Sequence, residues 1–282
     1  MYPAGRDDVR VRWLTLPNRL RIRVAECGPA DGRAVLLLHG WGGCIYMHRH
    51  MMPALAQAGY RAIAIDLPGH GLSDKPRSSS SYRCEAMVAS LELALDALSL
   101  ASVTVVGQSL SGRLALELAT RGSGRVKALA LIGPVGLGHV RRLRVAKFAT
   151  PRFSIPFAQY FVTRGLVKRM LVEAYSSADR VRDEEVDQYW APSQFRGYAR
   201  AMRALLHEFD WKPLGPDRLA AIAVPTVVII GGSDRLVSKV QSRTSMLPRA
   251  QVVVIAEGGH NVNETHPEAT HTALLALLAR TS

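Results

Sequence analysis

Short apolar runs alternate with amphipathic stretches along most of the chain, and this alternation limits the fold more than any other feature. The runs end in glycine or a polar residue and occupy residues 34–40, 60–67, 102–109, 126–133, 224–232 and 250–259. Helical spacing of apolar residues lies between or after them, at about 46–58, 84–98, 110–121 and 265–280. Uninterrupted apolar runs are typical of strands buried on both faces. The order predicts an α/β fold, with a mostly parallel twisted sheet and helices on both faces.

Two regions depart from this rhythm. Residues 9–16 and 20–27 alternate apolar with polar side chains, which predicts a β-hairpin with one solvated face. Residues 135–214 contain helical patterns, aromatics and prolines but no clear buried strand. We expect this segment to be a helical cap inserted between core segments 1–134 and 215–282. It would act as a lid over the carboxyl edge of the sheet, where open parallel sheets bind ligands.

Composition excludes several classes of protein. The 282 residues are 48% apolar and carry a net charge of +13, yet zinc-finger spacing, RNA-binding aromatic strands and basic heptads are missing, so we expect no nucleic-acid partner. No run is long enough for a transmembrane segment, and the first residues do not resemble a secretory signal. Cys27, Cys44 and Cys84 are an odd number without CxxC spacing, which indicates reduced thiols in a cytoplasmic protein.

The stretch GQSLSG, residues 107–112, joins an apolar run to a helical pattern. A serine at such a sharp turn needs small neighbours two residues away, and Gly107 and Ser111 fill those places. The turn would lift Ser109 above the sheet at a helix N-terminus, where free N–H groups favour negative charge. Ser109 is therefore the candidate nucleophile, and Ser111 would lie inside the first helical turn.

A nucleophilic serine needs a base, and the base needs an acid to orient it. Asp234 follows the apolar run 224–232, and His260 follows the run 250–259. The carboxyl ends of parallel strands meet at one edge, so both side chains should emerge beside Ser109. The sequence predicts Ser109, His260 and Asp234 as a catalytic triad.

Other residues could supply the base or acid, but their positions favour other roles. We expect His39 to be structural and His70 to lie in a turn. The final helix should leave His266 and His271 solvated or half buried. No strand places the remaining acidic candidates, Asp210 and Asp217.

Two backbone N–H groups should stabilise the oxyanion. One belongs to Leu110, which follows the nucleophile, and the other to Trp41 in the stretch HGWGG, residues 39–43. The glycines of that loop let its backbone approach a substrate closely. This scheme requires no metal and no organic cofactor.

Taken together, HGWGG, DLPGHGLSD at 66–74, GQSLSG, Asp234 and His260 resemble the α/β-hydrolase fold superfamily. The turn DLPGHGLSD is similar to that of its cap-bearing branch of serine esterases, carbon–carbon hydrolases and haloperoxidase-like enzymes. The resemblance covers the chain apart from the variable insertion. It implies an α/β-hydrolase fold and the chain order Ser, acid, His, which this sequence follows.

The chain departs from the family pattern at one position. Members commonly carry glycine where Ser111 stands, so this hydroxyl could crowd the turn or lie near the nucleophile. The relatives that use an aspartate nucleophile, haloalkane dehalogenases and epoxide hydrolases, are disfavoured because Ser109 occupies that place.

The predicted cap has a basic stretch without acids. Its cations are Arg141, Arg142, Arg144, Lys147, Arg152, Arg164, Lys168 and Arg169. Its aromatic residues are Phe148, Phe153, Phe157, Tyr160 and Phe161. The stretch is either a solvated face over packed aromatics or a landing surface for an acidic carrier protein, an anionic substrate or an anionic membrane.

These features favour a serine hydrolase that cleaves a carboxylic ester of a small acyl substrate through an acyl-enzyme intermediate. Two alternatives remain open at this point. One is hydrolysis of a carbon–carbon bond in a dienoic ketone by the same triad. The other is a ligand-binding receptor or pseudo-hydrolase with slow turnover.

Overall fold

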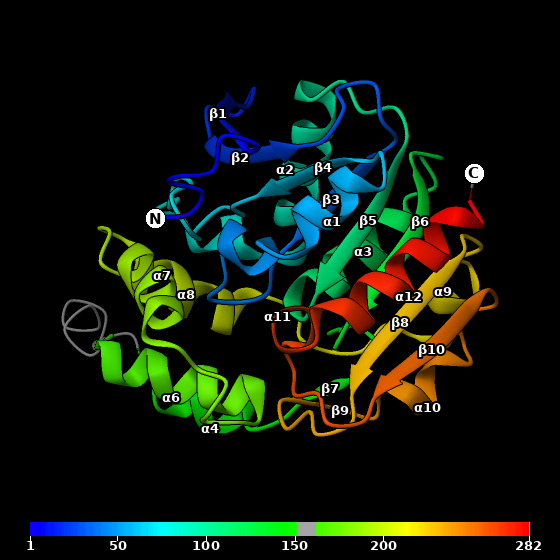
Figure 1. Cartoon of the computed structure of the whole chain (residues 1–282). Helices are drawn as coiled ribbons and strands as arrows, with labels where there is room; N and C mark the ends of the chain where they lie inside the picture. Colours follow the sequence, from blue (N-terminus) through cyan, green and yellow to red (C-terminus); the bar gives the residue numbers. More distant parts are fainter. Residues whose placement is uncertain (152–161, 282) are drawn as a thin grey trace.

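The computed structural model describes residues 1–151 and 162–281. Within them, the main sheet contains eight strands in the order β1-β2-β4-β3-β5-β6-β8-β10 (Figure 1). The strands are β1 Arg10–Thr15, β2 Arg21–Cys27, β3 Ala34–Leu38, β4 Arg61–Ile65, β5 Val103–Gln108, β6 Val126–Ile132, β8 Thr226–Gly231 and β10 Ala250–Ile255. The predicted α/β fold class is therefore confirmed.

The sheet is parallel from β4 to β10, whereas β1 and β2 form the predicted antiparallel hairpin. Leu38 pairs with Ile65 on one side and with Gly107 on the other. This register brings the carboxyl ends of β3, β4 and β5 to one edge of the sheet, where the loop after β3 meets Ser109.

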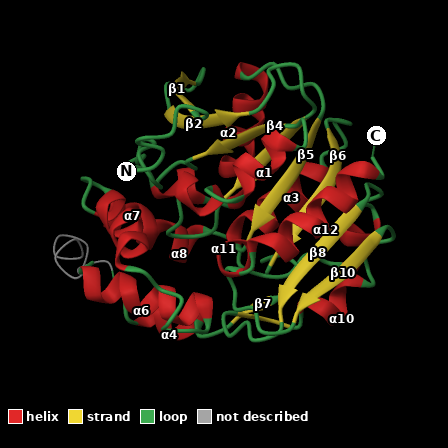
Figure 2. Ribbon diagram, in the orientation of Figure 1, coloured by secondary structure: helices red, strands yellow, loops and turns green. Residues whose placement is uncertain are grey.

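Both faces of the central strands are buried, which explains their uninterrupted apolar sequences. In β3, Val35 and Leu37 pack in one core cluster, while Leu36 and Leu38 pack in the other. Helices α1 Met51–Gln57 and α12 Pro267–Ala279 cover the first face, and α2 Cys84–Ala97, α3 Leu110–Thr120, α9 Pro216–Ala220 and α10 Val240–Thr244 cover the second (Figure 2). Short helices η1 Ile45–His48, η2 Ser79–Tyr82 and α11 Val262–Thr265 occupy connecting segments.

The predicted cap segment is mostly helical where it is described. It contains α4 Leu143–Phe148, α6 Arg164–Tyr175, α7 Asp183–Ser193 and α8 Tyr198–Glu208. Residues of α6 and α7 form an apolar cluster with Cys44, Tyr46 and Met47 from the loop after β3. A two-stranded ribbon of β7 His139–Val140 and β9 Val237–Ser238 joins the start of the segment to the core. The boundaries 135 and 214 stay a prediction.

Three details differ from the expected elements. The run 250–259 forms β10 at the edge of the sheet, so Val252 and Val254 are 36% and 49% exposed where burial on both faces was expected. The helical stretch 46–58 is divided between η1 and α1. At the other end of the chain, α12 begins at Pro267, because proline suits the first helical position, where no N–H is needed.

Cys27, Cys44 and Cys84 are free and buried, as the odd number of cysteines indicated. No helix in the described ranges is both long and apolar enough to cross a bilayer.

Three fully buried histidines predict loss of stability in acid. Burial lowers the pKa of His39, His48 and His70, that of His48 to about 3. Above the unfolded-state pKa of about 6.5, these histidines are neutral in both states and do not lower the free energy of unfolding. Below it, the unfolded chain binds protons that the folded chain excludes, so the free energy of unfolding declines. Between pH 6 and 5, we expect the free energy of unfolding to fall by up to about 1.4 kcal/mol per pH unit for each histidine whose folded-state pKa lies below that range, as that of His48 does. Urea unfolding at pH 7.5, 6 and 5 measures this slope, and a flat profile would contradict it.

Candidate active site

Ser109 lies between β5 and α3 in a backbone conformation that is unusual for a residue with a side chain. Its φ is 52° and its ψ is −114°. The Ser109 N–H donates to the Ile132 carbonyl at 2.9 Å, and the Ser109 carbonyl accepts from the N–H groups of Gly112 and Val135, each at 2.9 Å. These three bonds from two neighbouring segments hold the strained turn. The side chain remains partly exposed.

Glycine is required in this turn at Gly107 and in the facing loop at Gly40, because other atoms lie too close for a side chain. A Cβ at Gly107 would lie 2.5 Å from the Ser111 carbonyl oxygen. A Cβ at Gly40 would lie 3.1 Å from the Cβ of Ser109 and 2.1 Å from Oε1 of Gln108. The loop after β3 therefore passes directly over the nucleophile, as the position of HGWGG predicts.

Ser111 is fully buried and its hydroxyl donates to the carbonyl of His39. This hydrogen bond joins the HGWGG loop to the first turn of α3, so the Ser111 hydroxyl does not face the nucleophile as a free donor. The departure from the family pattern adds a contact between these two elements, and it leaves the turn at Ser109 intact.

Asp234 and His260 meet at the end of β8 and β10. His260 Nδ1 lies 2.8 Å from Asp234 Oδ2, and the other carboxylate oxygen accepts from the N–H groups of Leu236 and Val237 at 2.8 and 3.0 Å. Burial opposes ionisation of Asp234, but the charge and hydrogen bond of His260 and the two N–H donors outweigh it. The pKa of Asp234 consequently lies below its ordinary value. Such a carboxylate can orient the imidazole and stabilise its charged form.

The His260 ring adjoins the nucleophile turn through Gly133. Gly133 follows Ile132, which accepts the Ser109 N–H, and a Cβ on Gly133 would lie 2.9 Å from Nδ1 of His260. In the described part of the chain, neither Ser109 Oγ nor His260 Nε2 has a hydrogen-bond partner. Ser109 Oγ and His260 Nε2 are therefore not hydrogen-bonded to each other, and both are available for a substrate. Catalytic hydrogen bonds of this kind commonly tighten only when a substrate binds.

The two predicted oxyanion donors are also free. Across residues 1–151 and 162–281, the N–H groups of Trp41 and Leu110 have no acceptor. The Trp41 indole donates to the Met202 carbonyl of α8 at 3.3 Å and packs edge-on against Trp211, 5.9 Å away. The cap segment therefore supports the loop that carries this donor.

The alternative histidines have other roles. His39 Nε2 accepts from the Leu67 N–H at 3.1 Å, and His70 packs edge-on against His39. His266 and His271 are half buried around the start of α12.

Neither alternative acid approaches His260 in the structure. Asp210 pairs with Arg113 at 3.0 Å, and Asp217 lies in the first turn of α9. Among the described residues, no cluster of three or more His, Cys, Asp or Glu is arranged to hold a metal.

Acidic residues elsewhere in the cap segment neutralise part of its basic stretch. Arg164 pairs with Asp187 at 2.6 Å, Lys168 with Asp183 at 3.3 Å and Arg142 with Glu173 at 3.5 Å. Phe148 is 89% exposed, so it does not pack the cap onto the core as one interpretation required. Arg152, Phe153, Phe157, Tyr160 and Phe161 lie outside the described residues.

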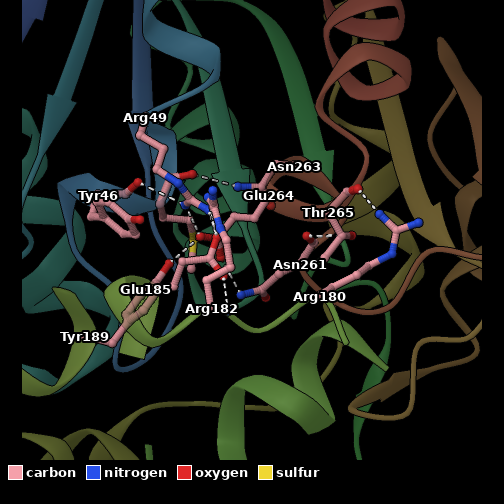
Figure 3. A network of polar contacts seen from close by, with 11 residues as sticks. Tyr46, Arg49, Arg180, Arg182, Glu185, Tyr189, Asn261, Asn263, Glu264 and Thr265 are labelled. Carbon is pink, nitrogen blue, oxygen red and sulfur yellow. Dashed lines mark hydrogen bonds and ion pairs between the residues drawn. The ribbon is translucent and has the colours of Figure 1, made fainter. Parts of the chain in front are cut away.

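Sequence patterns did not reveal a buried polar network that includes Asn261, the residue after His260 (Figure 3). It contains Arg49, Glu185, Asn261 and Glu264, together with Gln108 beside the nucleophile. Their positions, from 49 to 264, follow no periodicity. The only available signal was the presence of charged and amide residues in segments that are otherwise apolar.

Gly133→Ala tests the placement of His260. The new methyl group would contact the imidazole, and Gly133 also has a φ of +48°. Gly124→Ala is a matched control, because its φ is +69° but no atom lies within 4 Å of its Cβ. Both variants should lose about 1–2 kcal/mol of stability from the left-handed backbone. Only Gly133→Ala should slow fluorophosphonate labelling of Ser109, by roughly 100-fold; equal labelling rates would contradict this arrangement.

Comparison with known proteins agrees with this geometry. The family model described as "alpha/beta hydrolase fold" matches residues 33–267. A haloalkane dehalogenase of Psychrobacter cryohalolentis is 29% identical over 93% of this chain and 88% of its own length. The 30 kDa subunit of magnesium chelatase from Rhodobacter capsulatus is 31% identical over 86% of this chain and 85% of its own.

Solved structures share the fold. A meta-cleavage product hydrolase of Pseudomonas fluorescens superposes with a TM-score of 0.82, covering 96% of this chain and 98% of its own, at 22% identity. The strand order, the family match and these relatives lead to one assignment: the chain belongs to the α/β-hydrolase fold family and is a hydrolase of that family.

Proposed function

We propose that the protein is a serine hydrolase that cleaves a carboxylic ester. The observation that carries the proposal is the arrangement around Ser109. A strained turn presents its hydroxyl, two N–H groups without acceptors lie in the loops on either side, and a histidine paired with an ionised aspartate adjoins it. This arrangement fits acyl transfer.

In the proposed reaction, Ser109 Oγ attacks the ester carbonyl while Nε2 of His260 takes the hydroxyl proton. The negative oxygen of the tetrahedral intermediate accepts hydrogen bonds from the N–H groups of Trp41 and Leu110. One such donor contributes about 3–4 kcal/mol in the transition state. His260 then gives its proton to the leaving alcohol, and the acyl group remains on Ser109.

Water completes the cycle. His260 removes a proton from the water that attacks the acyl-enzyme, and it returns that proton to Ser109 Oγ as the carboxylic acid leaves. Asp234 keeps Nδ1 of His260 hydrogen-bonded and stabilises the imidazolium in both halves. No step uses a metal or an organic cofactor.

The proposed reaction differs from that expected of the dehalogenase relative in the residue that acts as nucleophile. An aspartate nucleophile would be expected for that chemistry, and Ser109 stands in its place. A second candidate is a ligand-binding protein with slow turnover, and it stays open because one relative, at 31% identity, is named as a magnesium-chelatase subunit and not as a hydrolase. We also propose a cytoplasmic location, which the free and buried state of the three cysteines supports.

Ser109→Ala should abolish labelling by a fluorophosphonate and reduce hydrolysis of p-nitrophenyl esters by roughly 10⁴-fold or more. Ser111→Ala is the control, because Ser111 is buried and its hydroxyl bonds a carbonyl, so labelling should persist. Rapid turnover of one acyl chain length would identify the acyl pocket.

Two other outcomes would contradict the ester proposal. Labelling without turnover of any ester would favour the ligand-binding alternative, or a carbon–carbon hydrolase if a dienoic ketone gave a coloured enol intermediate. Failure of the wild type to label would remove Ser109 as the nucleophile.

We further propose that the basic cap attracts an anionic acyl substrate or an acidic carrier protein. Arg141, Arg144 and Arg169 are exposed and form no ion pair with the described residues. Raising the ionic strength from 20 to about 500 mM should lower kcat/KM for a carboxylate-bearing ester several-fold and leave that for a neutral ester unchanged. Equal salt dependence for the two esters would refute an electrostatic role for the cap.

A further inference from the structure

We propose that Asn261 and Glu264 are positioning residues that hold Ser109 and His260 at a fixed separation and fasten both to the cap segment. The inference rests on the proposed function. It starts from an observation that the triad does not explain, a continuous chain of buried polar contacts from Gln108 to α7. Figure 3 shows the part of this chain from Asn261 to Glu185.

The first link joins the residues beside the two reacting side chains. Gln108 precedes Ser109 and Asn261 follows His260, and Gln108 Nε2 donates to Asn261 Oδ1 at 3.0 Å. Both side chains are buried, and they are 153 residues apart in the chain. Gln108 also packs beneath Gly40 of the oxyanion loop. A single side chain therefore contacts the loop of the oxyanion donor and the loop of the base.

Glu264 determines the orientation of Asn261. Asn261 Nδ2 donates to Glu264 Oε2 at 2.9 Å, while Tyr189 and Arg49 donate to Oε1. A carboxylate only accepts, so it keeps the amide N–H₂ of Asn261 on its own side and turns Oδ1 toward Gln108. Reversing the amide would place two donors against each other at Gln108 and two acceptors at Glu264.

Arg49 carries the network into the cap segment. Its guanidinium pairs with Glu264 and with Glu185 of α7 and lies 4.2 Å from the centre of the Tyr46 ring. Tyr189, the second donor to Glu264, also belongs to α7. Two cap residues thus bind the same buried charge cluster as the base loop.

Helix α6 adds an independent contact to the same loop. The carbonyl of Ala174, near its end, accepts the N–H of His260 at 2.7 Å and that of Asn261 at 3.1 Å. The loop that carries His260 is therefore held by the backbone of α6 and by the side-chain contacts of Asn261.

Stability alone is a weak explanation for such a network. Buried ion pairs often stabilise a protein no more than well-packed apolar residues of the same volume. A network that sets geometry should instead affect the chemical step, because a displacement of about 1 Å can reduce a rate 100-fold.

The test compares Gln108→Ala, Asn261→Ala, their double variant and Asn261→Asp. The rate of fluorophosphonate inactivation and the kcat for an ester are measured at a temperature where all variants are folded by circular dichroism. We expect Asn261→Ala to lower both by roughly 10–100-fold with KM within about twofold. The double variant should be no slower than the slower single variant, because both break one bond. Asn261→Asp should not rescue, since a second carboxylate would face Glu264.

Glu26→Gln is the matched control. Glu26 is a buried glutamate that pairs with two arginines, Arg61 and Arg12, and two strands separate it from β5. It should lose stability and keep the wild-type inactivation rate. If Asn261→Ala does not fold, the comparison uses Gln108→Ala and Glu264→Gln in its place. Glu264→Gln keeps an acceptor for Asn261 but loses the charge.

Two results would overturn the inference. One is a wild-type inactivation rate in Asn261→Ala despite a lower melting temperature, which would make the network purely structural. The other is strict additivity of the two alanine substitutions. Failure of the proposed function is distinguishable, because the wild type itself would then not react with the fluorophosphonate.

Discussion

The backbone of Ser109, at φ 52° and ψ −114°, is the constraint on which the site depends. A residue with a Cβ occupies this region only when its surroundings enforce it. Here the enforcement comes from β6 and its following loop, through hydrogen bonds to Ile132 and Val135, and from glycine at 107. Ser109 follows β5 and precedes α3, and in the described residues the Leu110 N–H has no backbone partner.

The loops that follow β3, β6 and β10 meet at this turn, and different contacts position each of them. The Ser111 hydroxyl fastens the HGWGG loop, which also packs on Gln108. Gly133 leaves room for the His260 ring, and Asn261 accepts a hydrogen bond from Gln108. The cap helices α6 and α7 contact the loop of His260 directly through Ala174, Tyr189 and the Arg49 cluster. The candidate site therefore lies where the sheet edge meets helices α6 and α7, and it is organised by polar contacts buried in an otherwise apolar interior.

The pattern of apolar residues along the chain predicted those elements whose formation depends on neighbouring residues in the sequence. Unbroken apolar runs located the central strands, and the residues that follow three of them, Ser109, Asp234 and His260, could be named because strand ends converge at one edge. The pattern overstated the burial of β10, because sequence does not show which strand lies at an edge. Contacts such as Gln108 with Asn261 and Arg49 with Glu264 have no periodicity, so only the folded chain brings them into view.

The most direct measurement is a crystal structure of the protein after reaction with a fluorophosphonate. We predict a phosphorus atom bonded to Oγ of Ser109, with its phosphoryl oxygen within hydrogen-bond distance of the N–H groups of Trp41 and Leu110. His260 should lie beside the leaving-group position with Asp234 still on Nδ1. Phosphorus on any other residue, or a phosphoryl oxygen directed away from both N–H groups, would contradict the central claim.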